Sequence, residues 1–304
     1  MKPSHATALR ALIPSWTLAM EAESKSPKTV EGYGGSLEQL ARWLEVNHHP
    51  NEPDEITTTL LRTWLVELIE TRSASTARTR WNGLRSFFAW ATEEGEIPEN
   101  PMALVKAPAL PEKLIDMLSV DELKAVLKVC EGPLLVDRRD QALILLYADT
   151  GARLSEVVAT SIDDLDMRLR ELVVMGKGRR ERVVPFGART ARALDRYLRM
   201  RARSKYAEGK WLWLSGKDGR ALTANAVQQM MRRRGAQAGV PGLHPHMFRH
   251  GFADAWLSAG GSEGDLMELA GWRSRQMVNR YGAANRSQRA REAYRGKSPM
   301  DNLE

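Results

Sequence analysis

The segment Thr150-Gly-Ala-Arg-Leu-Ser-Glu156 places an arginine and a glutamate three residues apart. It follows an apolar run at 142–147, so Gly151 is expected to end one helix and to let another begin. Arg153 and Glu156 would then be neighbours on one helix face. Taken alone, this spacing is typical of a surface ion pair, which contributes little to stability.

Lys177 lies between two glycines, and the β-rich runs on either side, residues 171–175 and 182–186, predict a hairpin with a basic turn. A lysine at such a turn can reach into a bound ligand. The turn is not a phosphate-binding P-loop, because the pattern GxxxxGK followed by Ser or Thr does not occur in the chain. Taken alone, Lys177 is typical of a solvated turn.

His246 and Arg249, in the segment His246-Met-Phe-Arg-His250, again lie three residues apart and would share a helix face. Two basic groups beside a second arginine suit a phosphodiester, because a planar guanidinium binds two phosphate oxygens at once. Trp272 and Tyr281 follow, nine residues apart. A tyrosine near a chain end is typical of packing, and nothing in the local sequence marks Tyr281 as a nucleophile.

Together these side chains could perform phosphoryl transfer. That reaction requires an in-line nucleophile, charge neutralisation on the phosphate oxygens and a proton for the leaving group. Tyr281 can supply the first and Lys177 the last, while the two arginines with His246 and Trp272 can supply the second. The ordinary pKa of tyrosine is about 10 and that of lysine about 10.4, and a cationic site favours the phenolate. Because guanidinium groups would do the work of a metal cation, we expect neither a metal nor another cofactor.

The ordered combination of these motifs resembles the tyrosine recombinase (phage integrase) family. The resemblance depends on five motifs: TGARLSE at 150–156, GKG at 176–178, HMFRH at 246–250, AGWRS at 270–274 and NRY at 279–281. Their order and approximate spacing match the family's catalytic domain. The N-terminal third matches through its length, helicity and position. We expect the small two-domain, Xer-like type, because the region before the linker leaves no room for an additional arm-binding domain.

The resemblance implies how the phosphate would be held. Arg153 and Arg249 would clamp the non-bridging oxygens, and Glu156 would support the first arginine. Trp272 stands where most members have a second histidine, a substitution that some members share. An indole N–H donates one hydrogen bond but cannot shuttle a proton, so we assign Trp272 to phosphate contact and packing.

The resemblance also implies a nucleophile and a proton route. Lys177 would be the general acid that protonates the leaving 5′ oxygen. His246 would bond the phosphate and assist proton transfer from Tyr281, which would attack phosphorus and form a 3′-phosphotyrosyl link to DNA. Because that link conserves the energy of the phosphodiester, strand exchange should need neither metal nor ATP. The implied enzyme is a site-specific DNA recombinase acting in integration, excision or resolution.

Hydrophobic periodicity predicts a mainly α protein with a small antiparallel β-sheet. Apolar stripes over 30–44, 60–69 and 84–90, an earlier helix around 9–20, and a helix start at Ser26-Pro27 indicate a bundle in the N-terminal third. Four prolines between 98 and 111 then break the helical pattern. Further helices are predicted after a capping box at Ser119, at a buried segment over 139–149, and over 189–206, 223–238 and 246–260, while Asp163, Asp164 and Asp166 are interpreted as a turn.

These elements predict two domains. We expect a helical core-binding domain over 1–105, a linker over 106–118 and an α/β catalytic domain over 119–304, with a C-terminal tail from about 285. The charge is uneven, since residues 1–110 carry 11 Lys and Arg against 14 Asp and Glu, and residues 111–304 carry 34 against 24. A basic catalytic domain suits DNA, with affinity that falls as salt rises.

Runs of arginine supply the candidate contacts to the DNA backbone, although solvated faces are the commoner meaning of such runs. The stretch 71–92 contains four arginines and no acid. The candidates are Arg72, Arg78, Arg80 and Arg85 in this stretch, and Arg232, Arg233, Arg234 and the arginines of 189–203 in the second domain.

The implied partner is double-stranded DNA at specific recombination sites, bound by a homotetramer in which the tail of each protomer docks on a neighbour. One cysteine, Cys130, excludes an internal disulfide. No apolar run approaches the roughly 18 residues that span a bilayer, and the N-terminus lacks the apolar region of a secretory signal. We therefore expect a cytoplasmic protein without a membrane partner.

Three alternatives stay open at this point. A non-catalytic DNA-binding regulator of a mobile element would keep the fold with a broken catalytic set. A type IB topoisomerase-like relaxase would share the tyrosine chemistry without pairing specific sites. A metal-dependent nuclease or transposase would lose its activity in EDTA.

Overall fold

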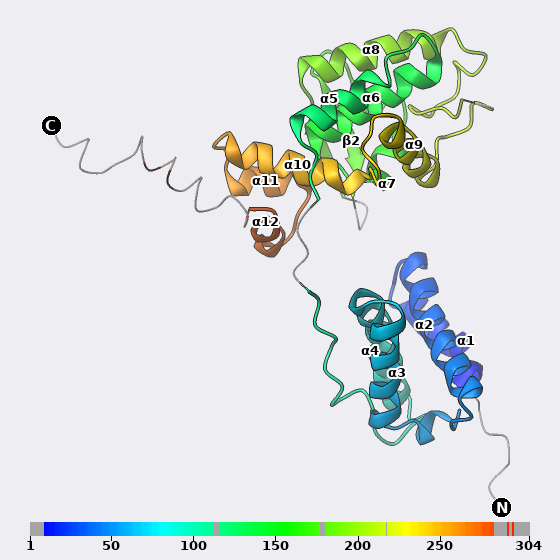
Figure 1. Cartoon of the computed structure of the whole chain (residues 1–304). Coiled ribbons are helices and arrows are strands. Elements are labelled where there is room, and N and C mark those ends of the chain that lie inside the picture. Colours follow the sequence, from blue (N-terminus) through cyan, green and yellow to red (C-terminus); the bar gives the residue numbers. More distant parts are fainter. Residues whose placement is uncertain are drawn as a thin grey trace, which may run out of the picture. The chain divides into compact units, whose positions relative to one another are not determined.

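The computed structural model describes residues 9–111, 116–176, 180–216 and 218–282, together with positions 291 and 294, and it describes side chains up to residue 278 and at these two positions. Lys177 and most of the predicted tail lie outside the described residues. The chain divides into two compact units, residues 1–113 and 114–304, each with its own buried core (Figure 1). Among the helices that are described, none is both long enough and apolar enough to cross a bilayer.

The N-terminal unit is a helical bundle, as the apolar stripes predicted. Its helices are α1 (Ile13–Ala22), α2 (Pro27–Val46), α3 (Thr58–Thr71) and α4 (Ala74–Glu93), with 3-10 turns at Leu9–Leu12 and Pro53–Glu55. Ser26 caps α2 by accepting the Thr29 N–H, which confirms the predicted start. In the core, Trp16 packs edge-on against Phe87 with ring centres 5.2 Å apart.

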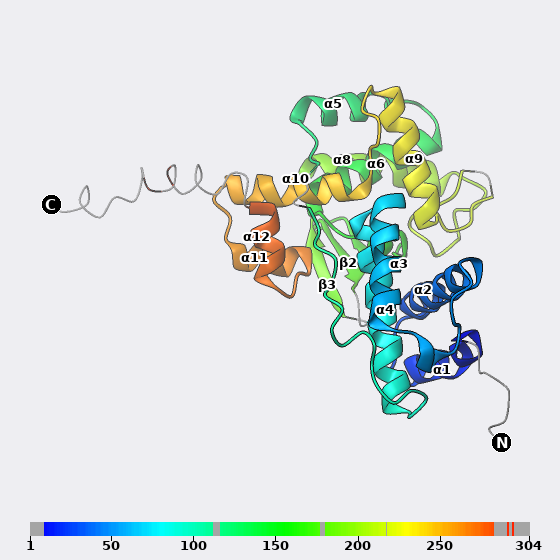
Figure 2. The same ribbon diagram turned by 60° about the horizontal axis from the view of Figure 1, so that its bottom comes forward.

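The C-terminal unit packs a three-stranded antiparallel sheet with helices (Figure 2). Its elements are α5 (Val120–Lys128), α6 (Leu135–Thr150), α7 (Leu154–Val158), β1 (Leu165–Asp166), β2 (Glu171–Met175), β3 (Glu181–Pro185), α8 (Ala188–Ala202), α9 (Ala224–Gln237), α10 (Pro245–Ser258), α11 (Glu263–Ala270) and α12 (Arg275–Gly282). The predicted fold class, mainly α with a small antiparallel sheet, is confirmed. So is the capping box at Ser119, where Ser119 and Glu122 cap each other's backbone N–H groups.

The predicted hairpin is formed by β2 and β3, in the register Val174 opposite Arg182 and Met175 opposite Glu181. The interpretation of Asp166 as part of a turn was wrong, because Leu165 and Asp166 form β1 and pair with Leu172 and Glu171. Two residues are too few for the alternation of polar and apolar side chains that marks a strand in a sequence.

Helix α6 is the buried helix that its apolar run predicted. It packs against α8 and α10, and its residues 142, 143, 144, 146 and 147 are fully buried. It ends at Gly151, which has the left-handed φ of +56°. A Cβ there would lie 2.6 Å from Cδ1 of Phe252 on α10. Both the backbone conformation and the space therefore require glycine immediately before Arg153.

Charged side chains are buried where α6 meets α9. Asp140 is fully buried and accepts hydrogen bonds from Arg139 Nη2 at 2.7 Å and from Arg234 Nε at 3.0 Å. Arg234 Nη2 also donates to Asp137 at 2.7 Å. Removing one member of such a cluster leaves the others charged in a site that excludes water.

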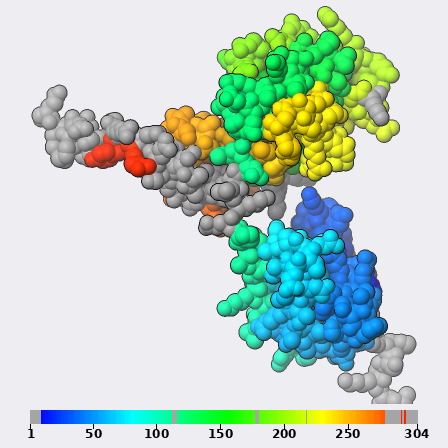
Figure 3. Space-filling view, in the orientation of Figure 1, coloured from blue at the N-terminus to red at the C-terminus, as the bar shows by residue number. Residues whose placement is uncertain are grey.

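The prediction that Arg234 and Arg201 contact DNA was wrong, because both side chains are buried. Helix α9 lies on the surface of its unit, as the yellow region of Figure 3 shows, but Arg234 points inward and is only 8% exposed. Arg201 is 5% exposed and donates to the carbonyl oxygens of Ala207 and Trp211. Both arginines stabilise the C-terminal unit, because their guanidinium groups donate hydrogen bonds to acceptors within the protein.

The substitution Asp140→Ala should lower the free energy of unfolding by about 3–5 kcal/mol, since it leaves Arg139 and Arg234 buried without their shared carboxylate. Denaturant unfolding followed by circular dichroism measures this. The matched control is Asp195→Ala, which removes the partner of Arg199 from an exposed pair on α8 and should change stability by less than about 1 kcal/mol. Equal losses in the two variants would contradict the assignment.

Candidate active site

Arg153 stands at the junction between α6 and α7. It is the N-cap of α7, and Glu156 in the first turn accepts both its backbone N–H at 2.9 Å and its Nη1 at 2.7 Å. The predicted Arg153–Glu156 contact is confirmed, but it forms across a helix start and not along a helix face. Glu156 is only 3% exposed while Arg153 is 38% exposed. The carboxylate therefore orients an arginine that still reaches solvent.

Arg182 on β3 also binds Glu156, and the sequence analysis missed it. Its Nη2 donates to Glu156 Oε2 at 2.7 Å. Burial opposes ionisation of Glu156, but hydrogen bonds from Arg182 and Arg153 outweigh it and hold the pKa of this carboxyl below its ordinary value. The glutamate is therefore ionised at neutral pH and partly balances two arginines. Only the basic run 179–182 hinted at this residue, and that run gives no sign of which arginine turns inward.

Arg249 on α10 is almost fully buried. Its Nη1 donates to the Gly151 carbonyl at 2.6 Å and its Nη2 to the Ala270 carbonyl at 2.7 Å. Its Cζ lies 5.1 Å from the centre of the Trp272 ring, a cation–π distance. Trp272 is itself 6% exposed. The structure thus brings Arg249 and Trp272 together, and Gly151 links them to the segment that carries Arg153.

Three consecutive carbonyl oxygens at the end of α11 each accept a hydrogen bond from a different arginine. Leu269 accepts from Arg182 Nε at 3.1 Å, Ala270 from Arg249 and Gly271 from Arg153 Nη2 at 2.8 Å. The last carbonyls of a helix lack intrahelical partners and carry partial negative charge. This helix end is therefore where strand β3, helix α10 and the start of α7 meet.

Gly271 is the C-cap of α11, with a left-handed φ of +63°. A Cβ at this position would lie 3.1 Å from Arg182 Cζ and 3.3 Å from Arg153 Nη1. Glycine is needed both for the backbone conformation and for the close approach of the two guanidinium groups.

A cavity of about 540 Å³ opens beside these groups. Arg153, Arg182, Gly271 and Trp272 contribute to its wall. In total, four arginines (153, 180, 182 and 273) and two glutamates (181 and 268) line it. The excess of guanidinium groups suits an anion with several oxygens, such as a phosphate.

His246 occupies the first turn of α10, one turn before Arg249. Burial lowers the pKa of His246 below its ordinary value, and the charges of His244 and Arg249 lower it further. The imidazole is therefore neutral at neutral pH and able to accept a proton. Within the described ranges, no three His, Cys, Asp or Glu side chains converge in the way that a metal ion requires.

Two further site residues were predicted, Lys177 and Tyr281. Lys177, which follows β2 and precedes β3 in the sequence, lies outside the described residues. Tyr281 belongs to α12, which follows α11 and packs against α10 and α11. Its backbone is described as helical, whereas its side chain lies outside the described part.

The predicted DNA-contact arginines differ in their surroundings. Arg72 at the end of α3, Arg85 on α4 and Arg232 on α9 are exposed. Arg85 lies over the Trp81 ring at 5.2 Å. The other three have protein partners: Arg78 donates to the Pro108 carbonyl, the half-buried Arg80 to Ser36, and Arg233 lies 3.7 Å from Asp140.

Comparison with known proteins identifies the class. Residues 116–288 match the family described as Phage integrase family, and residues 13–95 match the Phage integrase, N-terminal SAM-like domain. The chain is 32% identical over 252 residues to tyrosine recombinase XerC of Chromobacterium violaceum, covering 81% of each chain. It is 30% identical over 257 residues to tyrosine recombinase XerD of Bifidobacterium longum, covering 80% of this chain and 82% of that one.

Solved structures share the fold at lower sequence identity. The XerH site-specific recombinase bound to its difH substrate matches with a TM-score of 0.75 and 20% identity, over 94% of this chain and 84% of that one. A lambda integrase tetramer bound to a Holliday junction matches with a TM-score of 0.72 and 19% identity, over 91% and 78% of the two chains.

These matches define the class, that of enzymes that recombine DNA. The chain belongs to the phage integrase (tyrosine recombinase) family. It is a site-specific recombinase that cleaves and rejoins DNA.

Replacing Gly271 by alanine should impair DNA cleavage through the guanidinium groups that it would displace. The left-handed backbone costs a non-glycine residue about 1–2 kcal/mol, and displaced arginines should lower the single-turnover cleavage rate by about 10²-fold. Cleavage of a nicked suicide DNA substrate measures the rate, and thermal unfolding measures the stability.

The chain offers a matched control for this substitution. Gly260 follows α10 with a φ of +84°, and a Cβ there would meet nothing within 4 Å. Gly260→Ala should therefore carry a similar backbone cost and cleave DNA at nearly the wild-type rate. A comparable loss of cleavage in both variants would attribute the effect to strain and not to the arginines.

Proposed function

We propose that this recombinase cleaves one DNA strand at a specific site through attack by Tyr281, with Arg153, Arg249 and Trp272 binding the scissile phosphate. The observation that carries the proposal is the meeting of these three side chains at the end of α11. Helix α12, which carries Tyr281, begins at Arg275 and packs against both α10 and α11. The nucleophile's helix therefore starts from the same place as the phosphate-binding groups.

Charge on the phosphate would be neutralised by the two arginines acting in different ways. Arg153 lines the cavity, and its contacts with described residues use two of its five N–H donors. Arg249 is held rigidly by two carbonyls and the indole ring, so its charge is already positioned before the phosphate arrives. Fixed donors of this kind stabilise developing charge without reorganisation. No metal cation or ATP takes part in this mechanism.

The chemical step exchanges one phosphate ester bond for another. The phenolic oxygen of Tyr281 forms a bond to phosphorus as the bond between phosphorus and the 5′ oxygen breaks. The phenol proton passes to neutral His246, and the ammonium of Lys177 gives its proton to the 5′ oxygen. The products are a 3′-phosphotyrosyl link and a free 5′ hydroxyl. Attack of a 5′ hydroxyl from the partner strand reverses each transfer and rejoins DNA.

We assign the two units different duties in the cytoplasm. The helical region 1–105 would be the core-binding domain, joined through the linker 106–118 to the catalytic domain 119–304. Arg72, Arg85 and Arg232, with Arg78, Arg80 and Arg233 in supporting positions, would contact the DNA backbone. The relatives solved on a recombination site and as a tetramer on a Holliday junction support specific DNA sites and a homotetramer for this chain, whose tail from about 285 would contact a neighbouring protomer.

Substituting Tyr281→Phe should abolish covalent attachment to DNA while preserving DNA binding, because only the attacking oxygen is removed. Wild type and variant are expressed in a host that carries the native locus, and protein that retains DNA after denaturation is isolated in EDTA. Sequencing the attached 3′ ends should give one recurrent sequence for the wild type and none for the variant.

Other outcomes would assign another function. Attachment at scattered sequences would indicate a relaxing topoisomerase. Loss of the wild-type product in EDTA would indicate a metal-dependent nuclease. If neither cells nor a nicked suicide substrate yielded an adduct, the chain would be a DNA-binding regulator.

The cleavage rate at subsaturating DNA should fall on the acid side as His246 becomes protonated and can no longer accept the phenol proton. Because the pKa of His246 is lowered, this fall should occur below the ordinary histidine value of about 6.5. His246→Gln should be slower and should lack this acid limb. His244→Gln removes a charge that depresses the pKa of His246, so it should move the limb to higher pH. An unchanged limb in His246→Gln would exclude His246 as the acceptor.

A further inference from the structure

Arg182 connects three elements of the site. Its side chain is 14% exposed and extends from β3. One nitrogen donates to Glu156 on α7 at 2.7 Å and another to the Leu269 carbonyl on α11 at 3.1 Å. The two contacts use the rigid fork of the guanidinium, so they fix the position and the orientation of β3 relative to α7 and α11.

The described residues on either side of Lys177 lie close to this contact. Arg182 lies opposite Val174 in the hairpin register. Gly176, immediately before Lys177, approaches the pair so closely that a Cβ there would lie 3.6 Å from Glu156 Oε1 and 3.7 Å from Arg182 Nη1. The Gly176 N–H donates to the Arg180 carbonyl at 2.7 Å and closes the base of the loop. Gly176, the last described residue before Lys177, therefore packs directly against Arg182 and Glu156.

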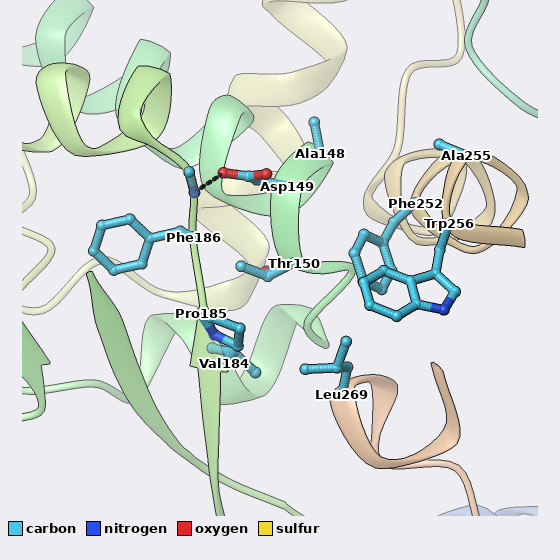
Figure 4. A pocket seen from close by; sticks show the side chains of 11 residues that line it. Ala148, Asp149, Thr150, Val184, Pro185, Phe186, Phe252, Ala255, Trp256 and Leu269 are labelled. Carbon is cyan, nitrogen blue, oxygen red and sulfur yellow. Dashed lines mark hydrogen bonds between the residues drawn. The ribbon is translucent and has the colours of Figure 1, made fainter. Parts of the chain in front are cut away.

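Apolar packing between β3 and α11 leaves an unfilled space. The hydrogen bond from Arg182 to the Leu269 carbonyl therefore helps to fix the distance between these two elements. A cavity of about 400 Å³ lies between these elements. Its wall includes Val184 and Pro185 of β3, Leu269 of α11, and Phe252 and Trp256 of α10, whose side chains are drawn in Figure 4. Side chains that face an unfilled space lose dispersion contacts on that side. Leu269 lines this unfilled space with its side chain, whereas its carbonyl oxygen is held by Arg182.

We propose that Arg182 is a positioning residue for the general acid. The inference rests on the proposed function, in which Lys177 protonates the 5′ oxygen. By holding β3 against Glu156 and the end of α11, Arg182 fixes the described residues on either side of the Lys177 segment, Gly176 and Arg180, relative to Arg153. Loss of Arg182 should therefore impair proton delivery to the leaving group more than attack by the tyrosine.

A DNA substrate with sulfur in place of the scissile 5′ bridging oxygen separates these two effects. A thiol has a pKa of about 8.5, so a thiolate leaves without the proton that an alkoxide requires. In single-turnover cleavage of the oxygen substrate, Arg182→Gln should be slower than wild type by about 10²-fold. On the sulfur substrate it should approach the wild-type rate.

Two reference variants calibrate the comparison, and a third controls for charge. Lys177→Ala should show the same recovery with sulfur, whereas Arg153→Ala should be slow on both substrates because the phosphate charge is unchanged. Arg168→Gln removes an exposed charge from the turn before β2. It should affect both substrates equally and by a small factor, through DNA attraction alone.

The outcomes distinguish the proposal from the function on which it rests. Recovery of Lys177→Ala without recovery of Arg182→Gln would overturn the positioning role and leave Lys177 as the acid. Failure of Lys177→Ala to recover would remove Lys177 as the acid and the proposal with it. A wild-type rate for Arg182→Gln on the oxygen substrate would also overturn the positioning role.

A conservative variant keeps the test decisive if Arg182→Gln is unstable in thermal unfolding. Arg182→Lys retains the charge, but a single ammonium cannot reproduce the fork that spans Glu156 and Leu269. It should show a smaller defect on the oxygen substrate and the same recovery with sulfur. A defect in Arg182→Lys that sulfur leaves unchanged would count against the proposal.

Discussion

Three successive carbonyl oxygens, those of residues 269 to 271, each accept a hydrogen bond from a different arginine. These three hydrogen bonds organise the catalytic unit. A helix end offers such carbonyls because nothing follows in the helix to use them. Each arginine comes from a different element, so the end of α11 fixes β3, α10 and the start of α7 at once. Helix α12, which carries the proposed nucleophile Tyr281, begins four residues later at Arg275. The relative positions of these elements therefore depend on one short stretch of backbone and not on several loops.

Glycine makes this arrangement possible at two positions. Gly151 and Gly271 both have a left-handed φ. A Cβ would clash with Phe252 at the first position and would crowd the guanidinium groups of Arg182 and Arg153 at the second. Each glycine ends a helix, and each is followed within two residues by a site residue, Arg153 or Trp272. Ending a helix sharply turns the next side chains toward the cavity while keeping their backbone anchored to a rigid element.

Residue type and order predicted the polar residues that act through local motifs. Arg153 with Glu156, and His246 with Arg249, could be found because the members of each pair lie three residues apart. Trp272, which meets Arg249, follows 23 positions later and was found only through the resemblance to the family. Arg182 could not be found in this way, because its partners lie 26 and 87 positions away. Arg234 was misjudged for the same reason, since its carboxylate partners on α6 lie 94 and 97 positions earlier. An arginine run looks the same in sequence whether a given member faces solvent or a buried aspartate. The strand β1 was not predicted, because only its pairing with β2 defines it.

The imbalance of charge at the end of α11 has a thermodynamic consequence. Arg153, Arg182 and Arg249 converge there, and two of them, Arg153 and Arg182, share a single carboxylate, that of Glu156. In the folded protein without DNA, positively charged guanidinium groups therefore lie close together with little negative charge to balance them. A bound phosphate group relieves that repulsion, so folding and substrate binding are linked equilibria. The enzyme exchanges some stability in its resting state for a site that is complete only with DNA, which is the common compromise between stability and activity.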